Sequence, residues 1–234
     1  MQNASPTPLD FDPFLLSIEL AAVTLVVLLI VGTPLAWWLA MTKNQIKPVI
    51  EAITALPLVL PPTVLGFYLL VFMGPEGWLG QVWDSLFGGH LTFTFTGLVV
   101  ASVIYSFPFV VQPLQAAFER LDRRTVEASL TLGASWLRTF WRVVLPQSRH
   151  GLLTAVVLGF SHTIGEFGVV LMVGGNIPGE TQVLSIAIYE HVETLDYAAA
   201  GSLSMMLVVF SFLGLLPLYA KTRKRRRLMR EVVA

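Results

Sequence analysis

His162 and Glu166 are two ionisable side chains within a long apolar stretch, residues 151–174. In a continuous helix they would lie one turn apart on the same face. Ionisable groups in so apolar a setting are costly and indicate a functional site by default. We expect Glu166 to pair with His162 or with backbone donors and to position this turn. His162 and its hydroxyl neighbours can donate hydrogen bonds and are better candidates to contact a ligand.

Three prolines, Pro57, Pro61 and Pro62, interrupt a second apolar stretch, residues 46–73. Each removes an amide donor and crowds a carbonyl one turn earlier, so a helix must kink or unwind there. We favour a pathway-lining segment, in which a half-helix that starts at Pro61 or Pro62 points its positive end at an anion. The alternative for both stretches is plain helix packing. The candidate pathway residues are Pro61, Pro62, Thr63, Gly66, Ser161, His162, Thr163, Gly165, Glu166, Phe167 and Gly168.

The segment of residues 119–150 is long for a connection that only reverses the chain. Within it, Glu127-Ala-Ser is followed by Gly133 and, twelve residues later, by Leu145-Pro146. Apolar residues at helical spacing, with small residues around Gly133, predict a short helix that another backbone can approach closely. Such a helix suits a groove on a partner protein. An amphipathic helix that lies on lipid, with its arginines at the headgroups, explains the pattern equally well.

The sequence lacks the residues that several kinds of chemistry require. The chain has no cysteine, and its four histidines are scattered without metal-ligand spacing, so we expect no metal site, no cofactor and no catalytic residues. No lysine follows a glycine, which excludes the phosphate-binding loop of an ATPase. The basic run at residues 221–230 directly follows an apolar segment, so we interpret it as an anchor on anionic lipid and expect no nucleic-acid partner.

These residues stand in a chain that is 55% hydrophobic and only 13% charged. Five stretches reach the ~20 apolar residues that a helix needs to cross a bilayer. Because five spans do not suit a closed β-barrel, we predict an all-α integral membrane protein. The predicted membrane domain covers residues 14–220, and its spans are residues 14–41, 46–73, 92–118, 151–174 and 197–220.

The charges predict how the chain is oriented. All 15 Lys and Arg residues lie in the segment after the first span, in residues 119–150 or after the fifth span. The segments on the opposite side, residues 1–13, 74–91 and 175–196, contain none. The positive-inside rule therefore places the N-terminal tail of residues 1–13 outside, and the loop 119–150 and the basic tail of residues 221–234 in the cytoplasm.

The pattern from Glu127-Ala-Ser through Gly133 to Leu145-Pro146 resembles the Glu-Ala-Ala loop of permease subunits of ATP-binding cassette importers. In that family the loop forms a coupling helix that docks into the nucleotide-binding subunit. Ser129 replaces the third residue, small for small, which leaves this expectation intact. The residues that the resemblance assigns to ATPase coupling are Glu127, Ala128, Ser129, Leu132, Gly133, Ala134, Leu145 and Pro146.

Residues 56–66, 165–168 and 176–181 carry a narrower resemblance, to molybdate importer permeases, which extends over residues 14–220. The first two stretches are shared loosely with sulfate and tungstate permeases and indicate an oxyanion importer. The third, Asn-Ile-Pro-Gly-Glu-Thr, favours molybdate. The resemblance implies a multi-pass protein of the cell inner membrane. Its expected partners are membrane lipid, two copies of a cytoplasmic ATP-binding subunit, an external oxyanion-binding protein and a second copy of itself.

The outward segments carry eight acidic residues and no Lys or Arg, so they should repel a free dianion. We therefore expect substrate to arrive on the binding protein, with these segments as its docking surface. The candidate docking residues are Asn176, Pro178, Glu180, Glu190 and Glu193. The alternatives are a tungstate or sulfate permease of the same type and, from another class, a self-contained channel or secondary transporter. The long loop and the odd number of spans argue against this other class.

Overall fold

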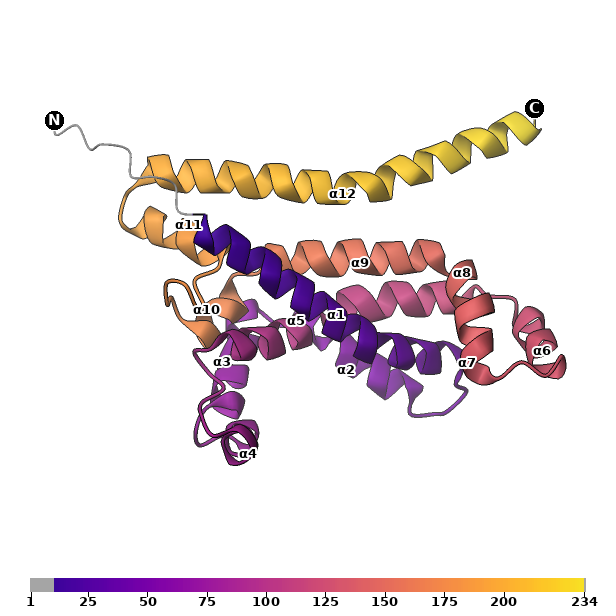
Figure 1. Cartoon of the computed structure of the whole chain (residues 1–234), viewed down its shortest axis with the longest axis horizontal. Helices are drawn as coiled ribbons and strands as arrows, with labels where there is room; N and C mark the ends of the chain where they lie inside the picture. Colours follow the sequence, from indigo (N-terminus) through magenta and orange to yellow (C-terminus); the bar gives the residue numbers. More distant parts are fainter. Residues whose placement is uncertain (1–10, 234) are drawn as a thin grey trace. The chain divides into compact units, whose positions relative to one another are not determined.

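The computed structural model describes residues 11–233, and their side chains except those of residue 217 and residues 219–233. The described residues form helices and no strand (Figure 1), as the all-α prediction requires. Most of the predicted N-terminal tail lies outside the described residues, as do the side chains of the basic tail. The elements are α1 (Asp12–Met41), α2 (Lys47–Val59), α3 (Pro62–Met73), α4 (Trp78–Phe87), α5 (Phe95–Glu119), α6 (Arg123–Thr131), α7 (Trp136–Thr139), η1 (Phe140–Val144), α8 (Leu145–Gln147), α9 (Arg149–Ile164), α10 (Gly168–Gly174), α11 (Leu184–Glu193) and α12 (Tyr197–Val233).

Within residues 11–233, three helices are long and apolar enough to cross a membrane: α1, α5 and the Tyr197–Leu216 part of α12. Two further pairs qualify only if each bent pair counts as one span. The pair α2 and α3 bends by 112°, and the pair α9 and α10 bends by 59°. The break between α2 and α3 lies where the prolines predict it. The break between α9 and α10 differs from the prediction made from the sequence, which is one helix through residues 151–174.

The chain divides into two compact units. The first unit comprises the described parts of Met1–Val23, Pro62–Ser102 and Thr163–Ser211. It holds α3, α4, α10, α11 and the N-terminal part of α1. Its described core residues include a small apolar cluster around Leu98 and Val170 and another around Leu184 and Leu203.

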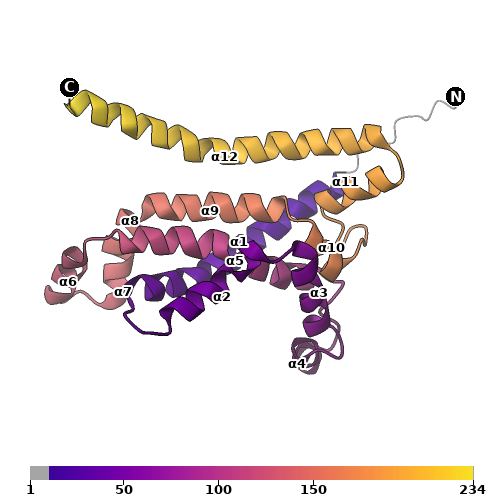
Figure 2. The same ribbon diagram turned by 180° about the vertical axis from the view of Figure 1, so that it is seen from behind.

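The second unit comprises Thr24–Pro61, Val103–His162 and the described part of Phe212–Ala234. Its core is a larger cluster in which Leu28 and Leu39 of α1 pack with Val110 and Leu114 of α5. Figure 2 shows α6 and α7 at the end of this unit where α5 ends and α9 begins. Residues 119–150 therefore fold as a helical segment that packs on this core through Val126 and Val144.

Candidate functional site

The loop of residues 119–150 contains the helices α6 and α7, which are joined by a sharp turn. Asp122 caps α6 by accepting a hydrogen bond from the Arg124 amide at 3.0 Å. Gly133 ends the helix with a φ of +83°, a conformation that glycine adopts without steric cost. Ser135 then caps α7 through the Arg138 amide. The predicted single helical run across Gly133 is therefore wrong, because the left-handed residue reverses the chain.

Ser129 faces the interior of this loop. Its hydroxyl lies 3.0 Å from that of the buried Thr139, so a hydrogen bond joins α6 to α7. Leu132 points the other way and is 88% exposed, and Glu127 and Ala128 are exposed as well. Ser129 thus braces the turn, whereas Glu127, Ala128 and Leu132 form its outer surface. The sequence motif alone does not separate these two roles.

The Leu145-Pro146 pair coincides with a change of helix type. The Leu145 amide donates to the Phe140 carbonyl, five residues earlier, and residues 140–144 form a π turn. Pro146 has no amide hydrogen, and its ring would crowd the Arg142 carbonyl in a regular α-helix. The wider turn accommodates the proline. The short helix α8 therefore follows directly after this turn, and α9 begins at Arg149.

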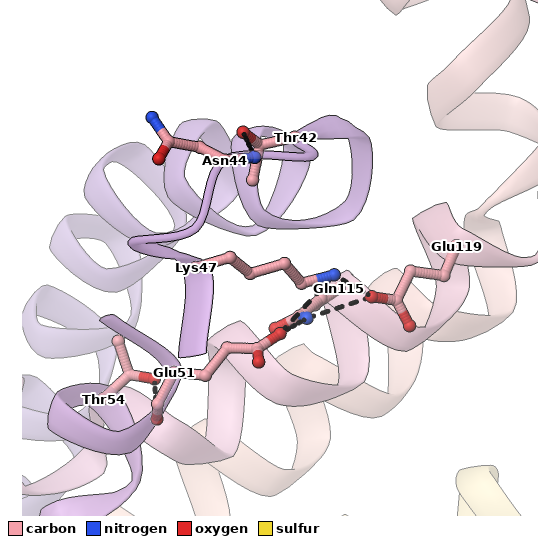
Figure 3. Close-up of polar contacts among 7 residues, drawn as sticks. All are labelled: Thr42, Asn44, Lys47, Glu51, Thr54, Gln115 and Glu119. Atoms are coloured by element: carbon pink, nitrogen blue, oxygen red, sulfur yellow. Dashed lines mark hydrogen bonds and ion pairs between the residues drawn. The ribbon is translucent and has the colours of Figure 1, made fainter. Parts of the chain in front are cut away.

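A polar cluster fastens α2 to α5 just before this loop (Figure 3). The Gln115 side-chain amide donates to Glu51 at 2.6 Å and to Glu119 at 3.0 Å. Lys47 lies 3.1 Å from Glu119 and 3.6 Å from Glu51. The Lys47 ammonium group and the Gln115 amide thus both contact the two carboxylates. The cluster therefore holds the start of α2 against the end of α5. No sequence motif predicts this cluster, because the residues that meet across the two helices are 64 to 72 positions apart in the sequence.

Pro62, Thr63, Gly66 and Gly168 are brought together in the first unit, where α3 packs on α10. Leu60, at the end of α2, is extended, with φ −72° and ψ 135°, as expected for a residue before proline. A Cβ on Gly66 would lie 2.9 Å from Met172 Cβ, and one on Gly168 would lie 2.8 Å from Pro62 Cβ. These two glycines therefore allow α3 and α10 to approach closely.

Glu166 lies in the break between α9 and α10 and is only 3% exposed. The Ser185 hydroxyl donates to its backbone carbonyl at 2.5 Å. Among the described residues, the side-chain oxygens of Glu166 have no partner that meets hydrogen-bond geometry. The predicted pairing of Glu166 with His162 or with backbone donors is therefore wrong. The helix ends before Glu166, so the two side chains do not share a helical face.

His162 belongs to an aromatic cluster of the second unit. Its Nδ1 lies 2.9 Å from the Ser106 hydroxyl. Its ring stacks on Phe109 with centroids 3.8 Å apart and lies 4.8 Å from the ring of Tyr105. The imidazole is thus fixed by α5. Two other pathway candidates belong to this part of α9: Ser161 is partly buried and Thr163 is buried.

The loop after α10 is held closed by a buried threonine. The Thr181 hydroxyl, which is fully buried, donates to the Gly174 carbonyl at 2.7 Å and accepts from the Ile177 amide at 3.1 Å. Gly175 and Gly179 have positive φ angles. Pro178 and Glu180 lie on the exposed side of the same loop.

Two of the predicted docking carboxylates carry structural contacts. Glu190 accepts hydrogen bonds from the side-chain amides of Asn176 at 2.8 Å and of Gln182 at 2.6 Å. Glu193 accepts from the Tyr189 hydroxyl at 2.5 Å, and this hydrogen bond raises the pKa of the tyrosine. Within the described part of the chain, the Glu180 side chain makes no hydrogen bond or ion pair, so its charge is the one left free.

Thr181, Gln182, Thr139 and Gln115 support the site but are absent from the residues that the sequence predicts for it. Thr181 is the last residue of the Asn-Ile-Pro-Gly-Glu-Thr stretch, and Gln182 follows it. Their place in a loop could therefore have identified them. Thr139 and Gln115 act across contacts between helices. A single sequence gives no signal for those contacts.

Comparison with known proteins places this architecture in context. A family model described as "Binding-protein-dependent transport system inner membrane component" matches residues 32–225. The chain is 56% identical to the molybdenum transport system permease protein ModB of Azotobacter vinelandii over 214 residues, 92% of this chain and 95% of that protein. It is 35% identical to the sulfate transport system permease protein CysT of Synechocystis sp. over 187 residues, 80% of this chain and 65% of that protein.

Among solved structures, the chain is similar to a chain of the bacterial alginate ABC transporter that was crystallised in complex with an alginate pentasaccharide-bound periplasmic protein. The TM-score is 0.72 at 15% sequence identity, and the match covers 94% of this chain and 80% of that chain. At this identity the likeness concerns the fold alone.

Proposed function

Because this chain belongs to the family of binding-protein-dependent inner-membrane transport components, we propose that it is the membrane-spanning permease subunit of an ATP-driven molybdate importer. The assignment of molybdate as the substrate rests on the 56% identity with a molybdenum permease over nearly the whole of both chains. The relatives are permease subunits and not enzymes in their own right. Energy therefore comes from a separate cytoplasmic ATPase, which we infer acts as a pair beneath two copies of this permease.

The turn between α6 and α7 is the proposed contact with that ATPase. Three observations support this role: the exposed outer surface at Glu127, Ala128 and Leu132, the left-handed Gly133, and the internal brace between Ser129 and Thr139. A braced turn with small, exposed residues suits a groove on a partner. Because residues 140–164 continue from this turn into α9, a displacement at the ATPase would be transmitted toward His162.

The proposed topology has five spans, with α2 paired to α3 and α9 paired to α10. The N-terminus lies outside and the C-terminus in the cytoplasm. The segregation of Lys and Arg along the sequence supports this orientation. Figure 3 shows Lys47 and Glu119 in the polar cluster, which this topology places at the cytoplasmic end of the second and third spans.

We assign the translocation pathway to the two helix breaks. Backbone that is neither helix nor strand is tolerated at membrane depth where it is buried in protein or lines a water-filled cavity. The N-terminus of α3 begins at Pro62, and its unpaired amides are suited to an anion. Gly66 and Gly168 hold α3 close to α10, so they position this end. Among the candidates of the second unit, His162 and Ser161 are the ones whose side chains can donate hydrogen bonds.

Delivery of substrate by an external binding protein follows from the acidic outer segments. Of the proposed docking residues, Glu180 is free to pair with a cation on that protein, whereas Glu190 also ties together the loop of residues 175–183. We expect Glu180→Gln to weaken docking most at low salt. Glu190→Gln should weaken docking at every salt concentration, because it disturbs the loop as well as the charge.

The test is uptake into proteoliposomes that contain the permease with its ATPase, with the binding protein loaded with molybdate, tungstate or sulfate in turn. We expect ATP-dependent uptake of molybdate when the loaded binding protein is present. Uptake of free oxyanion without the binding protein should be much slower. Uptake of free oxyanion at the full rate without the binding protein would contradict delivery. Uptake without ATP would favour the secondary-transporter alternative.

A sulfate importer is the second candidate, because the chain is also 35% identical to a sulfate permease. The two anions share shape and charge and differ mainly in size. Stimulation by sulfate-loaded binding protein alone, in the same proteoliposomes, would replace molybdate with sulfate and leave the importer assignment in place.

A further inference from the structure

An apolar groove of about 1040 Å³ lies within the second unit, between the second half of α1 and the segment from α7 to the start of α9. Its volume is at the upper end of the ~300–1,000 Å³ that small-molecule sites enclose. Thr33 and Thr42 contribute the only hydroxyl side chains of its lining, and the others are aliphatic, aromatic, proline or methionine. Four of the six tryptophans of the chain line it: Trp37, Trp38, Trp136 and Trp141.

The side of the groove formed by α7 and η1 is open. Trp136 is 54% exposed, Leu137 68% and Trp141 60%. Aromatic surface of this extent is costly in water and needs an apolar cover. The opposite wall belongs to α1, a helix that is long and apolar enough to cross a membrane. The groove therefore lies where hydrocarbon is available to fill it, and tryptophan is enriched at such interfaces.

Two arginines accompany the open side. Arg138 and Arg142 are one helical turn apart on the segment that carries Leu137 and Trp141, and both are exposed. Among the described residues neither side chain forms an ion pair, since the salt bridges there involve Lys47 and His191. No acidic residue lines the groove. A large apolar surface next to two unpaired guanidinium groups matches a molecule with a hydrocarbon tail and an anionic head.

We propose that this groove is a binding site for an anionic phospholipid of the cytoplasmic leaflet. An acyl chain lies against Trp37 and Trp141, and the phosphate is bound by Arg138 and Arg142. The choice of leaflet rests on the orientation in the proposed function. Lipid is favoured over protein because the α1 wall is membrane-spanning and the two arginines have the charge to bind the anionic cytoplasmic surface. The bound lipid supports the segment between the Gly133 turn and α9.

Tryptophan fluorescence can test the site directly. The Trp78→Phe, Trp83→Phe double variant leaves only the four groove tryptophans in the full chain. This variant is placed in phosphatidylcholine vesicles that contain a small fraction of acyl-brominated phosphatidylglycerol or, separately, acyl-brominated phosphatidylcholine, since bromine quenches nearby tryptophan. We expect brominated phosphatidylglycerol to quench well above its mole fraction, and brominated phosphatidylcholine to quench in proportion to it.

Arginine substitutions identify the headgroup contact. Arg138→Gln and Arg142→Gln should each lower the preference for the anionic lipid by roughly fivefold, and added salt should reduce it further. Arg123→Gln with Arg124→Gln, on α6 and away from the groove, is the matched control and should leave the preference unchanged. Equal quenching by both lipids, or equal loss of preference in the control, would overturn the proposal. Absence of quenching by either lipid would overturn it as well, and would indicate that protein covers the groove.

This readout is independent of transport. If vesicles with the full importer take up molybdate but the lipid preference is absent, the lipid site is wrong and the importer assignment stands. If the preference is present but no uptake occurs with any loaded binding protein, the importer assignment fails while the lipid site stands.

Discussion

Gly133 has a backbone conformation that L side chains rarely adopt, with φ +83°, and a Cβ built there would meet no atom within 4 Å. The constraint at this position is therefore the backbone angle and not the space around it. A left-handed residue without Cβ allows α6 to end sharply and leaves the outer surface of the turn clear. Both properties matter if another protein approaches here.

Substitutions at Gly133 can separate these two properties. Gly133→Asn should be tolerated, because asparagine adopts the left-handed conformation more readily than other residues. Gly133→Ala should cost about 1–2 kcal/mol of local stability, because of its Cβ. Gly133→Trp should insert in the membrane yet lose ATP-driven uptake, because the ring blocks close approach of the ATPase. Copurification of the ATPase and uptake are the measurements. Normal binding and normal uptake by Gly133→Trp would contradict the coupling assignment.

Thr181 is the second residue whose role is local and specific. Thr181→Val keeps the side-chain shape but removes the hydroxyl that serves Gly174 and Ile177, and we expect a loss of about 1–3 kcal/mol. Thr181→Ser retains the hydroxyl and is the control. Thermal unfolding of the purified proteins in detergent gives the comparison, and equal midpoints for threonine and valine would show that the buried hydroxyl does not hold the loop.

At the scale of elements, the two helix breaks have different origins and differ in how well the sequence predicts them. The break between α2 and α3 follows from two adjacent prolines, which exclude a regular helix on steric grounds. The break between α9 and α10 has no proline. There Gly165 precedes Glu166, whose buried carbonyl accepts from Ser185 across the unit, and Phe167 has φ −130° and ψ −64°. Tertiary contacts accompany this break, which is why composition did not predict it.

Removing the cause of the first break should remove the break. In a Pro61→Ala, Pro62→Ala variant the residue before each proline regains access to helical angles, and each substitution removes a penalty of about 3 kcal/mol on a continuous helix. We expect normal membrane insertion but loss of uptake. Pro57→Ala is the matched control, because Pro57 lies inside α2 and does not cause the break. Full uptake by the double variant would show that transport does not need the bend.

At the scale of the whole molecule, charge and hydropathy along the chain carried most of the prediction. They gave the apolar segments, the all-helical class and the orientation that we propose. They did not give the contacts that fix the site, such as the cluster of Lys47, Glu51, Gln115 and Glu119 or the bond between Ser129 and Thr139. Burial patterns follow from the solvent, whereas these pairings depend on how helices distant in sequence meet.

The orientation can be tested without reporters because the chain has no cysteine. Single cysteines at Ser85 in α4 and at Gln147 in α8, both exposed, should differ in their access to a membrane-impermeant maleimide. In intact spheroplasts we expect Ser85→Cys to be labelled, and Gln147→Cys to be labelled only after the membrane is opened. The reverse result, or labelling of both in sealed cells, would refute the five-span topology.

The π turn of residues 140–144 also determines the angular phase between the loop and α9. A helix advances about 100° per residue, and a π turn accommodates one residue more than the α turn it replaces. Compared with a segment wound as a regular α-helix with one residue fewer, α7 with Trp136 and Arg138 is therefore rotated by about that angle around the axis of the segment. The additional residue of the π turn thus determines which direction the Gly133 turn faces.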